Sequence, residues 1–123
     1  MAKILVIDDD DIVNGMIVQL LSEAGYDAVG AQDGDRGLKL VETESFDMIV
    51  TDIVMPKKEG LETILELRKK NKMVPIIAIS GGGKINADEY LLVAKGLGAK
   101  YTFKKPFDNK AFLNAVRVCL SGT

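Results

Sequence analysis

The stretch KILVIDDDD, residues 3–11, indicates both how the chain folds and where its polar chemistry lies. Residues 4–7 are continuously apolar, without the alternation typical of a strand that has one wet face. Such a run is typical of a strand buried on both faces of a parallel sheet. The aspartates that follow it begin where the chain leaves the sheet. The opening therefore predicts a buried strand with acidic side chains at its carboxyl end.

Four more short apolar runs follow along the chain, at residues 28–31, 48–51, 76–79 and 101–103. Gly30 interrupts the first of these, so we assign that strand from its place in the order. Helical periodicity fills the intervals between the runs. Strand and helix alternate five times, which predicts an α/β domain with a parallel sheet covered by helices on both faces.

The first helix is expected to carry a broad apolar face. Its members are Ile12, Val13, Met16, Ile17, Leu20, Leu21 and Ala24. Acidic residues precede this segment and Gly25 follows it, as is typical of helix starts and stops. Asp33 or Asp35 is expected near the start of the second helix, and Asp108 is a candidate cap for the last one.

Length and composition set limits on function. The 123 residues fit one domain, 1–123, and the net charge of −2 with a pI near 5.1 does not favour direct nucleic-acid binding. The chain has no histidine, which excludes His-ligated metals, Ser–His–Asp chemistry and a phosphohistidine on this chain. Cys119 is the only cysteine and lies in an apolar helical pattern, so we expect a buried thiol. The first apolar run is too short for a signal peptide or membrane span, and we expect a cytoplasmic protein without a membrane partner.

Polar side chains stand at the carboxyl ends of four predicted strands. They are Asp8 and Asp9 after the first, Asp52 ending the third, Ser80 ending the fourth, and Lys104 and Lys105 after the fifth. In an open parallel sheet, ligands bind beyond these carboxyl ends. Crowded carboxylates repel one another by about 4 kcal/mol per pair at 4 Å and a dielectric near 20, so they favour a cation. With only oxygen ligands on offer, the cation is predicted to be Mg²⁺.

The same set of side chains suits phosphoryl transfer. A carboxylate can act as a nucleophile towards phosphorus, and a lysine with a metal ion supplies positive charge to the phosphoryl oxygens. Taken singly, each residue has an ordinary explanation; Asp10 and Asp11, for example, suit a helix N-terminus. Their joint placement at one edge of the sheet is what favours a site.

Four motifs, in order, resemble the response-regulator receiver family of two-component signalling. They are KILVIDDD at 3–10, DIVMP at 52–56 with Gly60 following, VPIIAIS at 74–80, and Gly98-Ala99 leading to Lys105-Pro106-Phe107. The resemblance covers essentially the whole chain. It implies a doubly wound (βα)5 flavodoxin-like fold, with a five-stranded parallel sheet in the order 2-1-3-4-5.

The resemblance also implies site roles. Asp52 would be the phosphoacceptor, Lys105 its partner, and Ser80 the switch hydroxyl. The Mg²⁺ (or Mn²⁺) ligands would be Asp8, Asp9, Asp52 and the backbone carbonyl of Val54. The bond before Pro106 is expected to be cis.

The implied partners are a histidine kinase or histidine phosphotransfer protein, together with a downstream protein or an output domain missing from this sequence. Phosphorylation would shift the domain between two conformations that the downstream partner distinguishes. The implied reactions are limited to Mg²⁺-dependent self-phosphorylation and self-dephosphorylation, so the chain is not expected to be an enzyme in the ordinary sense.

Two features depart from the family pattern. Thr102 occupies the place where the family often has an aromatic switch residue, and Tyr101 is its neighbour. Since side chains alternate along a strand, Tyr101 should face the opposite way. Three glycines, at 81–83, follow Ser80 and would leave the site open.

Three other functions compete with this one. Asp8 and Asp10 have the spacing of a Mg²⁺-dependent aspartyl phosphatase, although the expected threonine after that pair is missing. A nucleotide or flavin binder is a second alternative, although residues 81–84 lack the rest of a phosphate-loop motif. The third is a degenerate receiver that acts as an interaction module.

Overall fold

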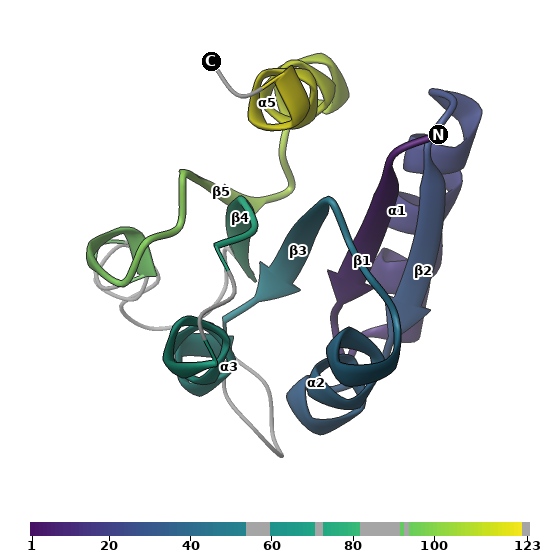
Figure 1. Ribbon diagram of the computed structural model, residues 1–123. Helices are drawn as coiled ribbons and strands as arrows, with labels where there is room; N and C mark the ends of the chain where they lie inside the picture. The colour runs from purple at the N-terminus through teal and green to yellow at the C-terminus, as the bar shows by residue number, and fades with distance from the viewer. Residues whose placement is uncertain (54–59, 71–72, 82–91, 93, 122–123) are drawn as a thin grey trace.

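The computed structural model describes residues 1–53, 60–70, 73–81, 92 and 94–121. Its strands are β1 (Lys3–Ile7), β2 (Asp27–Ala31), β3 (Met48–Asp52), β4 (Ile76–Gly81) and β5 (Tyr101–Lys105). All pairings are parallel, in the order β2-β1-β3-β4-β5 (Figure 1). The predicted α/β class and strand order are therefore confirmed.

The helices with described bounds are α1 (Asp11–Glu23), α2 (Gly34–Thr43), α3 (Gly60–Lys69) and α5 (Asn109–Ser121). Asp33 is the N-cap of α2 and accepts a bond from the Arg36 amide, which decides between the two predicted start residues. Asp108 accepts a bond from the Ala111 amide at the start of α5, as predicted. In the interval between the fourth and fifth strands, where a helix is also expected from the apolar spacing of Ala87, Tyr90, Leu91 and Ala94, the first three residues lie outside the described residues, whereas Ala94 is helical and buried.

Two apolar layers enclose the sheet. Leu5 and Ile7 face a cluster shared with α2 and α3, while Ile4 and Val6 face a second cluster shared with α1 and α5. Figure 1 shows α2 and α3 on one side of the sheet and α5 on the other. This double burial explains why β1 is continuously apolar, because both faces of the strand leave water. Cys119 is buried in the α1–α5 layer, as predicted, and burial raises the pKa of its thiol.

The prediction of a broad apolar face on α1 is wrong in part. Ile17 and Leu21 are buried, but the side chains of Ile12 and Met16 are 75% and 65% exposed. A helix that packs on one side of a sheet buries a single stripe, and residues one position off that stripe turn about 100° away. Asn14, a polar residue, lies inside the buried stripe.

The last strand has the alternation predicted for it. Thr102 pairs with Ala78, and Tyr101 and Phe103 pack into the α1–α5 layer. The Phe103 ring lies 5.8 Å from the rings of both Phe107 and Phe112, measured between centroids. Aromatic packing at this end of β5 therefore joins α5 rather than the α2–α3 side. Within the described part of the chain, every helix is too short or too polar to cross a bilayer.

Candidate functional site

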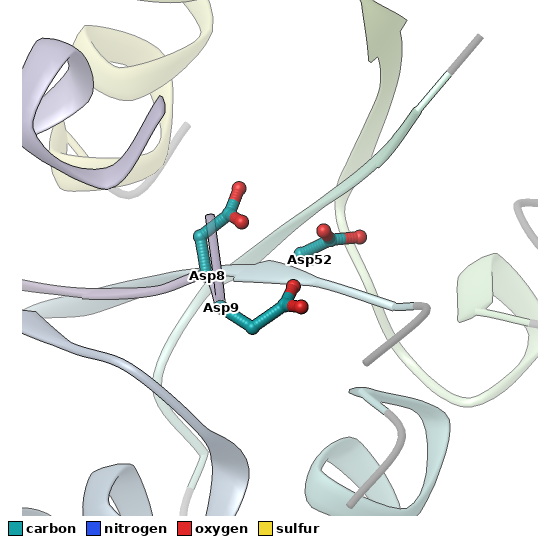
Figure 2. Close-up of side chains that lie close together, drawn as sticks. All are labelled: Asp8, Asp9 and Asp52. Carbon is teal, nitrogen blue, oxygen red and sulfur yellow. The ribbon is translucent and has the colours of Figure 1, made fainter. Parts of the chain in front are cut away.

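The strand register brings Asp8 and Asp52 together. β1 and β3 are neighbours, and Ile7 pairs with Thr51, so Asp8 and Asp52 are the next residues along adjacent strands. Asp9 follows in the turn. Carboxylate oxygens of Asp8, Asp9 and Asp52 lie within 4.8 Å of one another (Figure 2). The predicted acidic cluster is therefore present at the carboxyl edge of the sheet.

Lys105 reaches this cluster from the far end of β5. Its Nζ atom donates to Asp8 Oδ2 at 3.1 Å and to Asp52 Oδ2 at 3.2 Å. Because β4 separates β3 from β5, the lysine side chain crosses the end of β4 to make these bonds. The Lys105–Pro106 peptide bond is cis, as predicted.

Burial dominates the electrostatics of Asp8. Its side chain is fully buried, which raises the pKa of the Asp8 carboxyl from 3.8 to about 6. The Asp10 amide lowers it, the Asp52 charge raises it, and Lys105 lowers it. Burial also lowers the pKa of Lys105, but the charges of Asp52 and Asp8 outweigh this, so the net shift is upward and the ammonium group stays charged. Among the described residues, Lys105 is the cation that contacts this cluster of three carboxylates, so the cluster favours further positive charge.

The oxygen-only donor set fits a hard divalent cation. Asp8, Asp9 and Asp52 would supply carboxylate ligands to Mg²⁺. Val54, whose backbone carbonyl was expected to be a further ligand, lies outside the described residues, as do Gly82, Gly83 and Lys84.

Ser80 stands at the end of β4, between the strands that carry Asp52 and Lys105. Its side chain is fully buried, and its Oγ has no hydrogen-bond partner among the described residues. Buried hydroxyls are nearly always paired, so an unpaired one at a polar site suggests a partner that arrives with a ligand.

The remaining acidic and basic residues of the motifs lie outside the acidic cluster. Asp10 is the N-cap of α1, with its Oδ1 accepting bonds from the Ile12 and Val13 amides at 3.0 and 3.3 Å. Asp11 accepts a bond from Gln32 Nε2 at 2.7 Å. Lys104 is exposed, and Lys105 is the lysine that contacts the aspartates, in agreement with the prediction.

The sequence-based prediction missed Asn14, which bonds to the backbone of Asp8. The available signal was a polar residue between Val13 and Ile17, on the side of α1 that faces the sheet. A buried polar side chain in such a stripe needs backbone partners, and those partners lie next to the acidic cluster.

The chain therefore folds as an α/β domain with a cluster of three carboxylates, two of them in contact with a lysine, at the carboxyl edge of its sheet. The chain belongs to the response regulator receiver domain family, whose model matches residues 4–117.

Relatives in the family are transcriptional regulators. The chain is 36% identical over 98 residues to the alkaline phosphatase synthesis transcriptional regulatory protein PhoP of Bacillus subtilis, covering 72% of this chain and 41% of PhoP. It is 31% identical over 120 residues to the transcriptional regulatory protein CpxR of Klebsiella pneumoniae, covering 98% of this chain and 50% of CpxR. The chain thus spans about half the length of these relatives or less.

Solved structures of receiver domains have the same fold. The Francisella response regulator 1452 receiver domain superposes with a TM-score of 0.89 at 30% identity, covering 98% of each chain. A CheY-like receiver domain protein of Methanospirillum hungatei gives a TM-score of 0.89 at 25% identity, covering 99% of this chain and 95% of that one.

Proposed function

We propose that Asp52 accepts a phosphoryl group in a Mg²⁺-dependent reaction and that the phosphorylated domain controls a downstream partner. One observation carries the proposal: Lys105 Nζ bridges Asp8 and Asp52 inside a cluster of three carboxylates. This arrangement combines a nucleophile, a cation site and a fixed positive charge. Phosphoryl transfer depends mainly on such positioning and charge.

Each residue has a definite part in the reaction. The Asp52 carboxylate attacks phosphorus, an O–P bond forms, and the bond from phosphorus to the donor nitrogen breaks. Lys105 shifts its hydrogen bonds from the aspartates to a phosphoryl oxygen. Ser80 Oγ, buried and without a partner among the described residues, donates to another phosphoryl oxygen. When bound, Mg²⁺ supplies the positive charge that offsets the carboxylates and the phosphoryl oxygens.

The donor in this proposal is the phosphohistidine of a sensor histidine kinase or a histidine phosphotransfer protein, since this chain has no histidine of its own. Residues 1–123 form one receiver domain in a cytoplasmic signalling protein. The output is a separate partner or a domain outside this sequence, and the transcriptional regulators it matches are about twice as long. Thr102 occupies the place of the usual aromatic switch residue, and Ser80 and Thr102 are the switch residues of this proposal.

The phosphatase alternative is disfavoured by the first turn. An aspartyl phosphatase with Asp-x-Asp spacing would need the second carboxylate, that of Asp10, for proton transfer at the substrate. Here Asp10 caps α1 and its Oδ1 faces the helix amides. The degenerate-receiver alternative is disfavoured because Asp8, Asp9, Asp52 and Lys105 meet in one cluster.

Intact-mass analysis after incubation with a small-molecule phosphodonor, with and without Mg²⁺, tests the proposal. We expect a gain of one phosphoryl group that requires Mg²⁺ and disappears in Asp52→Asn. Asp27→Asn, an exposed aspartate at the start of β2, is the matched control and should behave as the unmodified chain does.

A gain of mass that survives Asp52→Asn would place the phosphoryl group elsewhere. No gain with any donor would favour the interaction-module alternative. Steady release of phosphate from an added phosphate ester would instead favour the phosphatase.

A further inference from the structure

We propose that Asn14 is a positioning residue that holds the turn at residues 8–10 in the conformation needed to bind the cation. The inference rests on the cation site in the proposed function. It adds a residue that lies outside the acidic cluster and would touch neither the ion nor the phosphoryl group. Gly30, on β2, contributes by leaving room for the Asn14 side chain.

The side chain of Asn14 is buried, and its amide nitrogen faces backbone carbonyls. Nδ2 donates to Ala31 O at 2.9 Å and to Asp8 O at 3.1 Å, with Val6 O at 3.5 Å. All three neighbours are acceptors, so the amide must present its nitrogen rather than its oxygen. The Asp8 amide donates to the same Ala31 oxygen at 3.1 Å. Asn14 therefore closes the end of the β1–β2 ladder at the residue that enters the acidic cluster.

Asn14 also holds the other end of the turn. Its backbone amide donates to Asp10 O at 2.8 Å, while its side chain donates to Asp8 O. One residue is thus bonded to the first and the last residue of the turn, and Asp9 lies between them. The Asp10 amide in turn donates to Asp8 Oδ1 at 2.9 Å, which orients the Asp8 carboxylate. A shift of Asn14 would move both Asp8 and Asp9 relative to Asp52.

Gly30 provides the space that this side chain occupies. A Cβ atom at position 30 would lie 2.3 Å from Asn14 Oδ1 and 3.3 Å from its Cγ. The first separation is a clash, so an alanine at position 30 forces the Asn14 amide out of place. Val18, the next nearest side chain, would be at 3.5 Å, an ordinary contact. This explains the glycine that interrupts β2: the strand gives up a side chain to admit Asn14.

The expected consequence falls on cation affinity. Residues that orient metal ligands without touching the metal typically change metal affinity by roughly 10–100-fold when they are removed. Asn14→Ala removes the bonds to Asp8 O and Ala31 O directly. Gly30→Ala removes the same bonds by displacing the amide, without altering Asn14 itself. Because both changes act through one side chain, their effects should not add.

The test is a titration of the full chain with Mg²⁺, in which the NMR signals of the amides of residues 8–10 report binding. We expect Kd for Mg²⁺ to rise about tenfold or more in each single variant and no further in the double variant. Gly15→Ala is the matched control for Gly30→Ala. It is also a glycine-to-alanine change and lies next to Asn14 on α1, but an added Cβ at position 15 meets nothing within 4 Å. Its Kd should stay at the value of the unmodified chain.

Two further readouts separate positioning from loss of fold. Urea unfolding identifies any variant that is not folded, and if Asn14→Ala fails to fold, Gly30→Ala alone decides. At saturating Mg²⁺ the phosphorylation rate of Asp52 should return to that of the unmodified chain, which general destabilisation does not predict. An unchanged Kd in Gly30→Ala, or singles whose effects add, would overturn the proposal.

A failure of the proposed function has a different signature. If the unmodified chain shows no Mg²⁺-dependent shift, the cation site itself is wrong. Amide hydrogen exchange in the metal-free protein then decides the role of Asn14 separately. Faster exchange at the Asp8 and Asp10 amides in Asn14→Ala and Gly30→Ala, but not in Gly15→Ala, would support a hold on the turn. Equal exchange in all variants would refute it.

Discussion

Lys105 Nζ donates to Asp52 Oδ2 at 3.2 Å, although 53 residues separate the two in sequence. The bond joins the ends of β3 and β5 across β4. It also places the Lys105 ammonium group between two buried carboxylates, because Asp8 Oδ2 lies 3.1 Å from Nζ. Without a bound cation, the Lys105 ammonium group therefore offsets part of the negative charge of the cluster.

Removal of that charge should make the fold dependent on added cation. Lys105→Met keeps the length and apolar stem of the side chain but removes the ammonium group that contacts both Asp8 and Asp52. We expect the metal-free variant to lose on the order of 1–3 kcal/mol of unfolding free energy. Mg²⁺ should then stabilise the variant more than it stabilises the unmodified chain, and Asp52 should be phosphorylated more slowly.

Urea unfolding with and without Mg²⁺ measures this difference. Lys104→Met is the control, because Lys104 is the exposed neighbour of Lys105 on the same strand. Equal responses of the two variants to Mg²⁺ would contradict the role given to Lys105.

The buried carboxyl of Asp8 should make the metal-free fold less stable as pH rises. Its pKa is raised to about 6 from 3.8, so between these values the folded state holds a proton that the unfolded state has released. Stability therefore falls as pH rises through this window. At neutral pH, this shift in pKa corresponds to a loss of roughly 2–3 kcal/mol of unfolding free energy relative to acidic pH.

Comparison of Asp8→Asn with the unmodified chain isolates this effect. The variant has no titrating carboxyl at position 8, so its unfolding free energy minus that of the unmodified chain should be larger at pH 7 than at pH 4. Urea denaturation in metal-free buffer at both values provides the measurement. A relative stability that does not change between the two pH values would show that Asp8 titrates normally.

The buried hydroxyl of Ser80 should be dispensable until the site holds a phosphoryl group. Ser80→Ala removes a buried group with no partner among the described residues, so we expect unchanged stability or a gain of up to about 1–3 kcal/mol in the unphosphorylated protein. After phosphorylation, the shift of amide NMR signals around β4 should shrink, because the bond to the phosphoryl oxygen is missing.

An exposed serine on α1 offers a control for this substitution. Ser22→Ala should alter neither the stability of the unphosphorylated form nor the response to phosphorylation. A large loss of stability in unphosphorylated Ser80→Ala would mean that the hydroxyl already has a structural role.

Asp10 and Asp9 are neighbours that should respond differently to the same change. Asp10→Ala removes the cap of α1 and should cost about 1 kcal/mol of stability. Since the Asp10 carboxylate faces the helix amides, Mg²⁺ affinity should change little. Asp9→Ala should leave stability nearly unchanged, because Asp9 is exposed, and should weaken Mg²⁺ binding instead.

Thermal unfolding and Mg²⁺ titration of both variants distinguish these outcomes. The reverse result, with Asp10 controlling Mg²⁺ affinity, would revive the phosphatase reading based on Asp8 and Asp10.

Local sequence determined the elements of this protein. The strands were predictable because continuous apolar runs report burial on both faces, and the caps Asp10, Asp33 and Asp108 because a short polar side chain satisfies free helix amides. The family motifs added the order of the sheet. With that order, the meeting of Asp8, Asp9, Asp52 and Lys105 at one edge followed, since parallel strands end on the same side.

Tertiary structure alone decided the rest. Whether Ile12 and Met16 face the core or the solvent depends on how far α1 is rotated against the sheet, which apolar periodicity leaves open across a broad face. The pairing of Asn14 with Gly30 depends on the distance between a helix and an edge strand, and no pattern within either segment encodes that distance. Sequence patterns report which residues avoid water, whereas contacts between separate elements are set by packing, where a single added Cβ atom is a clash.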